Sequence, residues 1–359
     1  MDSAAPQGIR LMQAAVTGGT GFLGEAIVRL LVPQAECVRV LVRRPEDDTR
    51  VRSLQAQPIR GDLASHEACA ALIRPGDVVF HCAARVEMTG RWEDFRRTTV
   101  EGTGRLLQAA LSQGAQRFVY VSSAAVYSKK GASVGPVSAG KTQAVPARYN
   151  LYGRAKAMAE MLVRRECERA GCSWVILRPV FIYGPGNRVL VRNFARLLDR
   201  GRLFTVGSGS NRISTAYIDE AAEAVVLAGL DPRAHGKVYD VASDEAVTQT
   251  QFINATADAL GMPRPTRHVP VRIAFAAAWA ADIVARLPGR EPPFTRAMID
   301  LMSTDQVIDA GLLREELGWT HRTRFAEGMW RMQEWYQRTR LKEDRGDPDT
   351  CGGRVLQSA

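Results

Sequence analysis

The sequence predicts an α/β protein with a doubly wound parallel sheet and a smaller, mostly helical C-terminal region. Short apolar runs such as "LMQAAV", "CVRVLV" and "RFVYVS" alternate with amphipathic helical stretches such as "GEAIVRLLV" and "MAEMLVRRECERA". This alternation is typical of βαβ units, in which helices cover both faces of parallel strands. The 359 residues, of which 46 % are hydrophobic and 24 % charged, are enough for one large domain or two smaller ones.

We expect residues 11–180 to form the first domain, with 213–245 returning a helix and a strand to it. The segments 181–212 and 246–340 contain turns, prolines and helical patterns, and they form the second region. Near its end, the apolar residues of "RFAEGMWRMQEWY" recur at helical spacing and are predicted to pack on the body of the protein. Residues 1–10 and 341–359 are polar and are expected to be disordered tails.

The composition argues against several classes of protein. The six cysteines form no CxxC pair and no cluster with histidine, so neither a metal site nor a secreted disulfide framework is predicted. There is no signal peptide and no run of about 18 apolar residues, so we expect a cytoplasmic protein without an integral membrane segment. The net charge of +10 comes from arginines interleaved with acids, and nucleic-acid binding is not expected.

A glycine-rich turn follows the first predicted strand, in "AAVTGGTGFLGEAIVRLL". Gly18 permits a tight turn, Gly21 lets the backbone approach a pyrophosphate, and Gly24 lets the next helix lie close to the strand. The helix N-terminus adds amide donors and a partial positive charge. The order of strand, turn and helix predicts a Rossmann-type dinucleotide site formed by Thr17, Gly18, Thr20, Gly21, Phe22, Leu23 and Gly24.

The end of the second predicted strand, in "CVRVLVRRPED", bears on the choice between NADP(H) and NAD(H). Arg43 and Arg44 stand where an acidic residue would hold the ribose of NAD. Guanidinium groups suit a 2′-phosphate, so NADP(H) is favoured and NAD(H) is the alternative. In that alternative the two arginines are surface residues without a role after the strand, and Asp47 or Asp48 hydrogen-bonds the ribose of NAD. Asp62, after the next short strand, is placed to hydrogen-bond the adenine.

The segment "YNLYGRAK" places two tyrosines near one lysine. In a helix Tyr152 and Lys156 lie about one turn apart and touch, whereas Tyr149 lies about two turns from the lysine. Only Tyr152 is therefore expected to feel the ammonium directly. Taken alone, such a pair is also an ordinary feature of a helix surface.

The motifs TGxxGxxG, "GDL", "HCAA", "YVSSAAVY" and YxxxK, in this order, resemble those of the extended short-chain dehydrogenase/reductase family over nearly the whole chain. The resemblance implies an enzyme with the catalytic set Ser123, Tyr152 and Lys156, with Ser122 as the reserve for the serine. Members of the family are often homodimers through the helices that flank the sheet. Further cofactor contacts are implied at Leu63, Ala83, Tyr152, Lys156 and Pro179.

The family chemistry explains these residue types. Hydride addition to a carbonyl carbon leaves an alkoxide that needs a proton, and a tyrosine with a pKa of ~10 is a poor participant near neutral pH. We expect Lys156 and the positive nicotinamide to lower the pKa of Tyr152, and Lys156 also to hold the nicotinamide ribose. Ser123 donates a hydrogen bond to the substrate oxygen. Thr99 stands where the family commonly has asparagine, which leaves open a proton relay through that position.

The reaction class follows from smaller resemblances. Ala124 and Ala125 stand where dehydratases of the family carry an acidic pair, so dehydration is not expected. "HCAARVEMTGRWEDF" and the C-terminal "PVRIAFAAAWAADIV", "ELGW" and "AEGMWRMQEWY" resemble the 3β-hydroxysteroid dehydrogenase branch. This resemblance implies NADP(H)-dependent interconversion of a ketone and a secondary alcohol on a hydrophobic, steroid-like or alicyclic small molecule. The apolar stretch around residues 269–288 is too short to span a membrane and is expected to cover the substrate.

Two alternatives stay open. A nucleotide-sugar epimerase or reductase would use the same serine, tyrosine and lysine, with Arg212 holding a diphosphate. A non-catalytic NADP-sensing relative would typically lack the tyrosine and the lysine, which are both present here. The residues predicted to line the substrate site are Arg85, Met88, Trp92, Tyr149, Tyr183 and Arg212.

Overall fold

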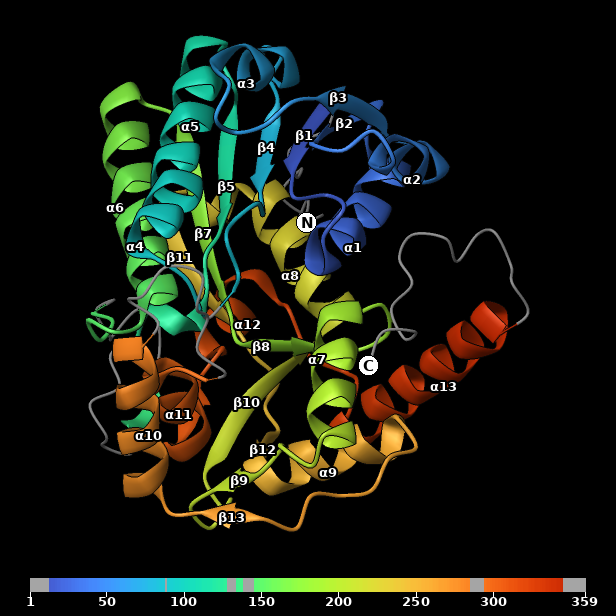
Figure 1. Cartoon of the computed structure of the whole chain (residues 1–359). Coiled ribbons are helices and arrows are strands. Elements are labelled where there is room, and N and C mark those ends of the chain that lie inside the picture. Colours follow the sequence, from blue (N-terminus) through green and yellow to red (C-terminus); the bar gives the residue numbers. More distant parts are fainter. Residues whose placement is uncertain (1–12, 88, 128–133, 138–144, 285–293, 345–359) are drawn as a thin grey trace, which may run out of the picture.

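The computed structural model describes residues 13–87, 89–127, 134–137, 145–284 and 294–344 (Figure 1). The tail expected at 1–10 and the residues from 345 onward lie outside this part of the chain. The last helix, α13 (Phe325–Asp344), continues into the segment that was expected to be a C-terminal tail. Its first residues, Phe325 and Met329, are buried, as the helical spacing of the apolar residues predicts.

The core of the fold is a parallel sheet with the strand order β11, β7, β5, β4, β1, β2, β3. Strand β1 pairs with both β2 and β4, so the order of the strands reverses beside it. In such sheets ligands bind beyond the carboxyl ends of the strands at this point. The strands are β1 (Gln13–Thr17), β2 (Cys37–Val42), β3 (Gln57–Arg60), β4 (Val78–His81), β5 (Arg117–Val121), β7 (Ser173–Pro179) and β11 (Lys237–Val241).

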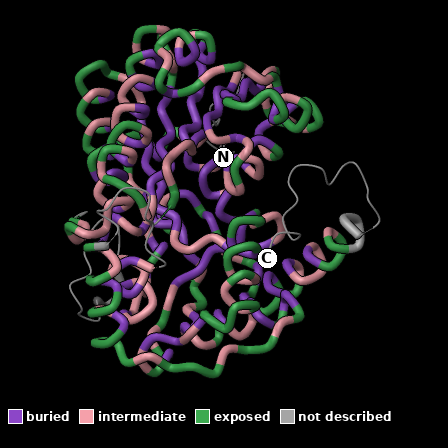
Figure 2. The backbone as a smooth tube through the Cα atoms, in the orientation of Figure 1, coloured by how far each residue is buried: buried purple, intermediate pink, exposed green. Residues whose placement is uncertain are grey.

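Helices cover both faces of this sheet, which confirms the predicted doubly wound fold (Figure 1). In β5, Val119 and Val121 belong to the core on one face, whereas Phe118 and Tyr120 belong to the core on the other. The inner strands are therefore buried, whereas the edge strand β3 has no buried residue, and the outer sides of the helices are exposed (Figure 2). The first face carries α1 (Phe22–Leu31), α8 (Ile218–Leu230) and α12 (Gly311–Leu317), and the second carries α3 (His66–Leu72), α5 (Gly102–Ser112) and α6 (Leu151–Ala170).

The connection between β4 and α5 has an irregular helix. A short α4 (Trp92–Phe95) runs into a π-helical segment, Arg96–Glu101, before α5 begins. Such wide helical turns are rare and often occur at functional sites. Another short helix, α2 (Asp47–Ser53), joins β2 to β3.

The second region lies beyond the carboxyl ends of the main strands and combines helices with short strands (Figure 1). Its helices are α7 (Arg188–Asp199), α9 (Gln249–Ala259), α10 (Val271–Val284), α11 (Arg296–Ser303) and α13. One small sheet contains β12 (Ala246–Thr248), β10 (Arg212–Tyr217), β14 (Gln306–Ile308) and β6 (Val134–Val137), with β8 (Phe181–Tyr183) paired to β10. Another contains β13 (His268–Val269) and β9 (Thr205–Val206).

The chain returns to the main sheet after it has entered the second region. Helix α8 packs on the first face beside α1, and β11 pairs with β7 at the edge of the sheet. Strand β10, which starts at the expected boundary of this return, instead pairs with β12 in the small sheet. The carboxyl edge of the main sheet is thus enclosed by elements that are distant in sequence.

Candidate active site

The glycine turn lies directly after β1, and its backbone leaves no room for side chains. Gly18 has a φ of +73°, and a Cβ there would lie 2.7 Å from the backbone nitrogen of Ala83. A Cβ on Gly24 would lie 2.0 Å from the carbonyl oxygen of Gly18. These two positions therefore require glycine for the helix and the neighbouring strand to approach the turn this closely.

The same turn presents a cradle for a pyrophosphate. Gly21 is the N-cap of α1, and no side chain caps this helix end. The amides of the first turn, which include those of Phe22 and Leu23, therefore have no capping side chain, and the helix dipole favours an anion there. A Cβ on Gly21 would meet only the Gly18 oxygen, at 3.1 Å, so the outer side of the turn is open. The residues present fit a dinucleotide, as the sequence predicts.

Some of the charged residues that follow β2 form ion pairs, whereas Arg43 does not. Arg44 forms an ion pair with Asp47 at 3.1 Å, and Asp48 forms one with Arg60 at 2.8 Å. Arg43 is exposed and, among the described residues, has no hydrogen-bonding or ionic partner. Both acids that could take a ribose are therefore engaged with arginines, while one guanidinium is free.

The segment after β3 contains Asp62 and Leu63, two of the residues expected to contact the cofactor. Asp62 is exposed, and its carboxylate accepts a hydrogen bond of 2.8 Å from the amide of Ala64. Leu63 is buried, and its carbonyl accepts a hydrogen bond of 2.6 Å from Arg105 on α5. The adenine contact expected of Asp62 remains a prediction, with the residue held at the correct edge of the sheet.

The predicted catalytic residues come together at the ends of two elements. Ser123 follows β5, and Tyr152 lies in the first turn of α6. The Ser123 side chain acts on the Tyr152 phenol and favours its ionised form, which opposes the rise in the pKa of that phenol. Ser122, the reserve, is buried and its hydroxyl has no hydrogen-bond partner among the described residues. The geometry therefore joins Ser123, rather than Ser122, to the tyrosine.

The start of α6 is fixed by two residues that the sequence analysis did not single out. The side chain of Asn150 accepts a hydrogen bond of 2.9 Å from Gly153 and donates one of 2.9 Å to the carbonyl of Ala125. A Cβ on Gly153 would lie 2.2 Å from that carbonyl oxygen. An asparagine before a helical pattern is a recognisable N-cap signal, but its contact with the serine loop is visible only in the fold.

Lys156 lies deep in the site. It is 2 % exposed, and its ammonium donates a hydrogen bond of 2.6 Å to the carbonyl of Val121 and lies 4.9 Å from the centre of the Tyr120 ring. Burial lowers the pKa of Lys156 to about 8, against the opposing influence of Cys82 and Glu160.

The pKa of the Tyr152 phenol reflects its burial. Burial raises the pKa of Tyr152 above its ordinary value, and the Ser123 side chain counteracts this only in part. Desolvation of the phenolate dominates in the protein without cofactor, and the lowering expected from Lys156 together with the positive nicotinamide remains a prediction for the enzyme with cofactor bound.

A buried ion pair anchors the middle of α6 to the sheet. Glu160, one turn after Lys156, pairs with Arg178 on β7 at 2.7 Å, and both side chains are almost inaccessible to solvent. Removing one partner of such a pair would leave an uncompensated buried charge, so the pair fixes the helix on the strand. Helix α6, which carries Tyr152 and Lys156, is therefore held at its start by Asn150 and in its middle by Glu160.

His81, at the end of β4, is fully buried and connects the glycine turn to α5. Its Nδ1 lies 2.6 Å from the hydroxyl of Thr17, and its Nε2 lies 2.8 Å from the hydroxyl of Thr103. The Thr103 hydroxyl donates to the carbonyl of Thr99, so it accepts from Nε2, and Thr17 donates to Nδ1. Burial, together with the charge of Lys156, lowers the pKa of His81 to about 3, so the imidazole is neutral. This positioning role connects residues too distant in sequence to be predicted.

Thr99 holds the loop that follows β4. It is fully buried in the π-helical segment, and its hydroxyl accepts a hydrogen bond of 3.2 Å from the amide of Arg85. The Arg85 guanidinium lies 5.3 Å from the centre of the Phe95 ring. The threonine thus positions the backbone of the loop that is expected to line the substrate site.

The residues that were expected to line the substrate site make different contacts in the structure. Tyr149 donates a hydrogen bond to Asp300 on α11, and Trp92 stacks under the guanidinium of Arg154 at 4.4 Å. Tyr183 is 1 % exposed and packs on other aromatic rings in the core, and its contact with a substrate remains a prediction. Arg212 is exposed at the start of β10, and Met88 lies outside the described residues.

The described residues also bear on two expected absences. No group of three or more potential metal ligands occurs among them. The structure contains no helix, within the part that it describes, of the length and apolarity needed to cross a membrane.

Comparison with known proteins identifies relatives of this chain. Residues 14–242 match the model of the NAD dependent epimerase/dehydratase family. A 2-alkyl-3-oxoalkanoate reductase of Stenotrophomonas maltophilia is 31 % identical, over 90 % of this chain and 98 % of the relative. A 3beta-hydroxysteroid-dehydrogenase/decarboxylase of Arabidopsis thaliana is 25 % identical, over 88 % of this chain and 77 % of the relative.

Solved structures show the same architecture. A UDP-glucose 4-epimerase of Thermotoga maritima superposes with a TM-score of 0.70 at 21 % identity, covering 91 % of this chain and 99 % of the other. At this identity the likeness supports the fold alone. The family match over more than half of the chain and the reductase relative show that this protein is an enzyme of the NAD dependent epimerase/dehydratase family, the extended short-chain dehydrogenases/reductases.

Proposed function

We propose that this enzyme interconverts a ketone and a secondary alcohol on a hydrophobic small molecule, with NADP(H) as the hydride carrier. The observation that carries the proposal is the placement of Ser123, after β5, and Tyr152, at the start of α6, at the sheet edge that also holds the glycine turn, with Asn150 tying the start of α6 to the loop that follows Ser123. Two hydroxyl groups that converge in this way are suited to a single carbonyl oxygen.

Each catalytic residue has a distinct role. The nicotinamide, when bound, supplies or accepts the hydride at the carbonyl carbon. In the reducing direction the C=O double bond becomes a C–O single bond, and Tyr152 gives its proton to that oxygen. Ser123 donates a hydrogen bond to the same oxygen as negative charge develops there. Lys156 stabilises the phenolate that remains and holds the ribose. Because burial raises the pKa of Tyr152, the phenol is protonated before the reaction, as an acid must be.

The preference for NADP(H) rests on the residues after β2. Arg43 is exposed and unpaired among the described residues, while Asp47 and Asp48 already bind arginines. A 2′-phosphate would give Arg43 a charge-assisted partner, whereas the ribose hydroxyls of NAD would need a free carboxylate.

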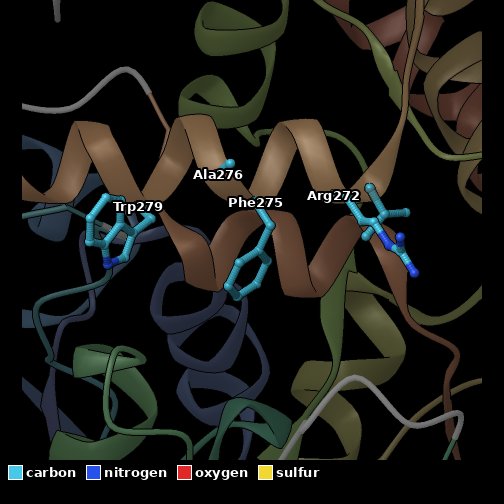
Figure 3. Close-up of a pocket in the computed structure, with 5 residues that line it drawn as sticks. Arg272, Phe275, Ala276 and Trp279 are labelled. Carbon is cyan, nitrogen blue, oxygen red and sulfur yellow. The ribbon is translucent and has the colours of Figure 1, made fainter.

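The substrate class rests on the relatives. The names of the bacterial reductase and of the plant steroid dehydrogenase both describe a ketone or a hydroxyl group on a largely hydrocarbon molecule. The apolar residues of α10 (Figure 3) suit such a substrate better than a charged nucleotide. We therefore favour a hydrophobic 3-oxo acid or an alicyclic ketone.

A nucleotide-sugar epimerase or reductase is the second candidate. The observation that favours it is Arg212, which is exposed at the start of β10 and whose side chain has no partner among the described residues. A free guanidinium at this place would suit a diphosphate.

One assay separates the two candidates. Purified enzyme is mixed with NADPH and a panel of apolar ketones, and the loss of NADPH absorbance is followed. In parallel, enzyme with NAD and UDP-glucose is analysed for the 4-epimer by chromatography. We expect turnover of ketones and no epimer. Epimer formation without ketone turnover would replace the first function by the second.

We also propose that the enzyme is a cytoplasmic homodimer. Helix α6 lies on the outside of the sheet and exposes two methionines on one face, Met158 at 42 % and Met161 at 72 %. Exposed apolar side chains at helical spacing commonly pack against a partner.

A further inference from the structure

Two cysteines lie on either side of the turn that ends α6. Cys167 is in the last turn of this helix, and Cys172 directly precedes β7. Gly171 closes the helix in the left-handed conformation, with a φ of +67°. The amide of Gly171 donates to the carbonyl of Glu168, and the amide of Cys172 donates to the carbonyl of Cys167. This pair of hydrogen bonds is the Schellman motif, in which the side chains at the positions of the two cysteines frequently touch.

The backbone brings the two cysteines within reach of a disulfide. The amide nitrogen of Cys172 lies 3.0 Å from the carbonyl oxygen of Cys167. Because that oxygen is about 2.4 Å from its own Cα and the nitrogen is about 1.5 Å from its own, the two Cα atoms are at most about 7 Å apart. Disulfides in proteins span Cα separations of up to about 7 Å. The separation of the two backbones is therefore compatible with a disulfide.

The two side chains face the same part of the core. Cys167 is fully buried in the apolar cluster on the second face of the main sheet, and Cys172 packs against that cluster. The Sγ of Cys172 lies 3.6 Å from the carbonyl oxygen of Ala115, which packs on the same cluster. Each thiol also shifts the pKa of the other. The two sulfur atoms are therefore neighbours inside the turn.

The two thiols differ in reactivity. Contact with Cys167 lowers the pKa of Cys172, burial opposes this change, and the guanidinium of Arg117 adds to the lowering. Arg117 is held there by a hydrogen bond of 2.9 Å to the hydroxyl of Ser173. Contact with Cys172 and burial raise the pKa of Cys167. Since the thiolate is the form that attacks oxidants and Cys172 is also partly exposed, Cys172 is the more reactive of the two.

We propose that Cys172 and Cys167 form a reversible disulfide when the protein meets hydrogen peroxide. The Cys172 thiolate attacks one peroxide oxygen, the O–O bond breaks, and the hydroxide that leaves takes up the proton of the former thiol as water. Cys172 is then a sulfenic acid. The sulfur of Cys167 attacks the sulfenic sulfur, and the hydroxyl group leaves with the Cys167 proton as a second water. Two electrons pass from the two thiols to the peroxide, and a dithiol reductant reverses the reaction.

This site lies at the other end of the main sheet from the proposed active site. Cys172 precedes β7, whereas Ser123 follows β5, and these two strands are parallel neighbours. The inference is therefore independent of the proposed function. A disulfide here would protect Cys172 from irreversible oxidation and would fasten the end of the helix that carries Tyr152 and Lys156.

Peptide mapping tests the disulfide directly. Trypsin cuts after an arginine unless proline follows, and Arg169 separates the two cysteines, so the reduced protein yields the peptides 166–169 and 170–188. The full chain is treated with hydrogen peroxide, alkylated, digested without reductant and analysed by mass spectrometry. We expect the two peptides as one linked species that separates on addition of dithiothreitol. Unlinked peptides after peroxide treatment, or Cys172 linked to a different cysteine, would overturn the proposal.

Variants assign the roles of the two thiols. Cys172→Ser should lose the linked species. Cys167→Ala should lose it too and let Cys172 proceed to the sulfinic acid, seen as two added oxygen atoms on the peptide 170–188. If Cys172 reached the sulfinic acid to the same extent in the unaltered protein, Cys167 would not protect it and the proposal would fail.

Cys37→Ser is the matched control. Cys37 is also partly exposed, but it lies on β2, where its thiol donates a hydrogen bond of 3.7 Å to the side chain of Gln57 on β3. This variant should form the linked species to the same extent as the unaltered protein. Loss of the linked species in Cys37→Ser would show that Cys37, and not the pair at the end of α6, reacts first with peroxide, which would overturn the proposal.

Discussion

Burial shifts the two titratable groups of the catalytic set toward their neutral forms. It raises the pKa of the Tyr152 phenol and lowers that of the Lys156 ammonium to about 8. Both shifts have one cause, because either group loses hydration when it becomes charged. The free protein therefore holds a protonated phenol at Tyr152, as the proposed proton donation requires. The sequence predicts which tyrosine contacts the site but not the sign of its pKa shift, since the sign depends on burial.

Tyr152→Phe should abolish most of the turnover without weakening the cofactor. The variant keeps the aromatic ring and loses the proton, so we expect kcat to fall about 10²- to 10⁴-fold. NADPH affinity, measured by fluorescence titration, should change little. Tyr149→Phe is the matched control: it removes a hydroxyl that bonds to Asp300 and should retain measurable hydride transfer. Full activity of Tyr152→Phe would contradict the assignment.

The free energy of unfolding should rise with pH through the range in which Lys156 titrates. Its pKa in the folded state is about 8, below the ordinary value of about 10.4, so between these values the unfolded chain binds the extra proton. The free energy of unfolding should increase by about 3 kcal/mol in total between the two pKa values of Lys156. Urea unfolding across this range, compared with Lys156→Met, measures it. Equal pH slopes for both proteins would show that burial does not depress this pKa.

At the level of elements, features that depend on neighbouring residues can be predicted from the sequence, whereas contacts between distant residues cannot. The glycine spacing predicts the turn after β1 because a tight turn and a close helix are requirements of neighbouring residues. The contact of His81 with Thr17 joins residues 64 positions apart, and no local pattern announces it. The packing of Tyr183 against Phe325 is not predicted for the same reason, because it depends on α13 returning to the core.

The preference for NADP(H) over NAD(H) can be tested at Arg43, directly after β2. Arg43→Gln should weaken NADPH at least tenfold and leave NADH nearly unchanged, because only NADPH has a phosphate to pair with the free guanidinium. Arg44→Gln is the control and should have a smaller effect, since Arg44 is already paired with Asp47. Separate titrations with the two cofactors measure these affinities. If Arg43→Gln weakened the binding of NADPH and NADH equally, Arg43 would not be the residue that selects NADPH.

At the scale of the whole molecule, the main sheet is predictable and the enclosing region is less so. Alternating apolar runs predict β1, β4 and β5 because each strand is buried on both faces. The two small sheets escape prediction, because their strands are only two to six residues long and come from distant parts of the chain. A catalytic edge enclosed in this way can be inferred from sequence only through resemblance.

The oligomeric state gives a prediction for the assembled protein. Met161→Glu places a charge in the exposed apolar face of α6 and should convert a dimer to a monomer. Light scattering coupled to size-exclusion chromatography measures the mass. Val189→Glu is the control, because Val189 is 55 % exposed on α7 and should leave the mass unchanged. If the unaltered protein were a monomer, the proposed homodimer would be wrong.

Strand β11 arrives at the edge of the main sheet only after the chain has built β8, α7 and β10. A fragment that stopped after β8 would leave the backbone groups of β7 unpaired along a strand rich in valine, isoleucine and leucine. Such a bare edge invites intermolecular strand pairing and aggregation. The main sheet is therefore not a detachable N-terminal module, because its last strand is supplied by residues that follow α7 and β10.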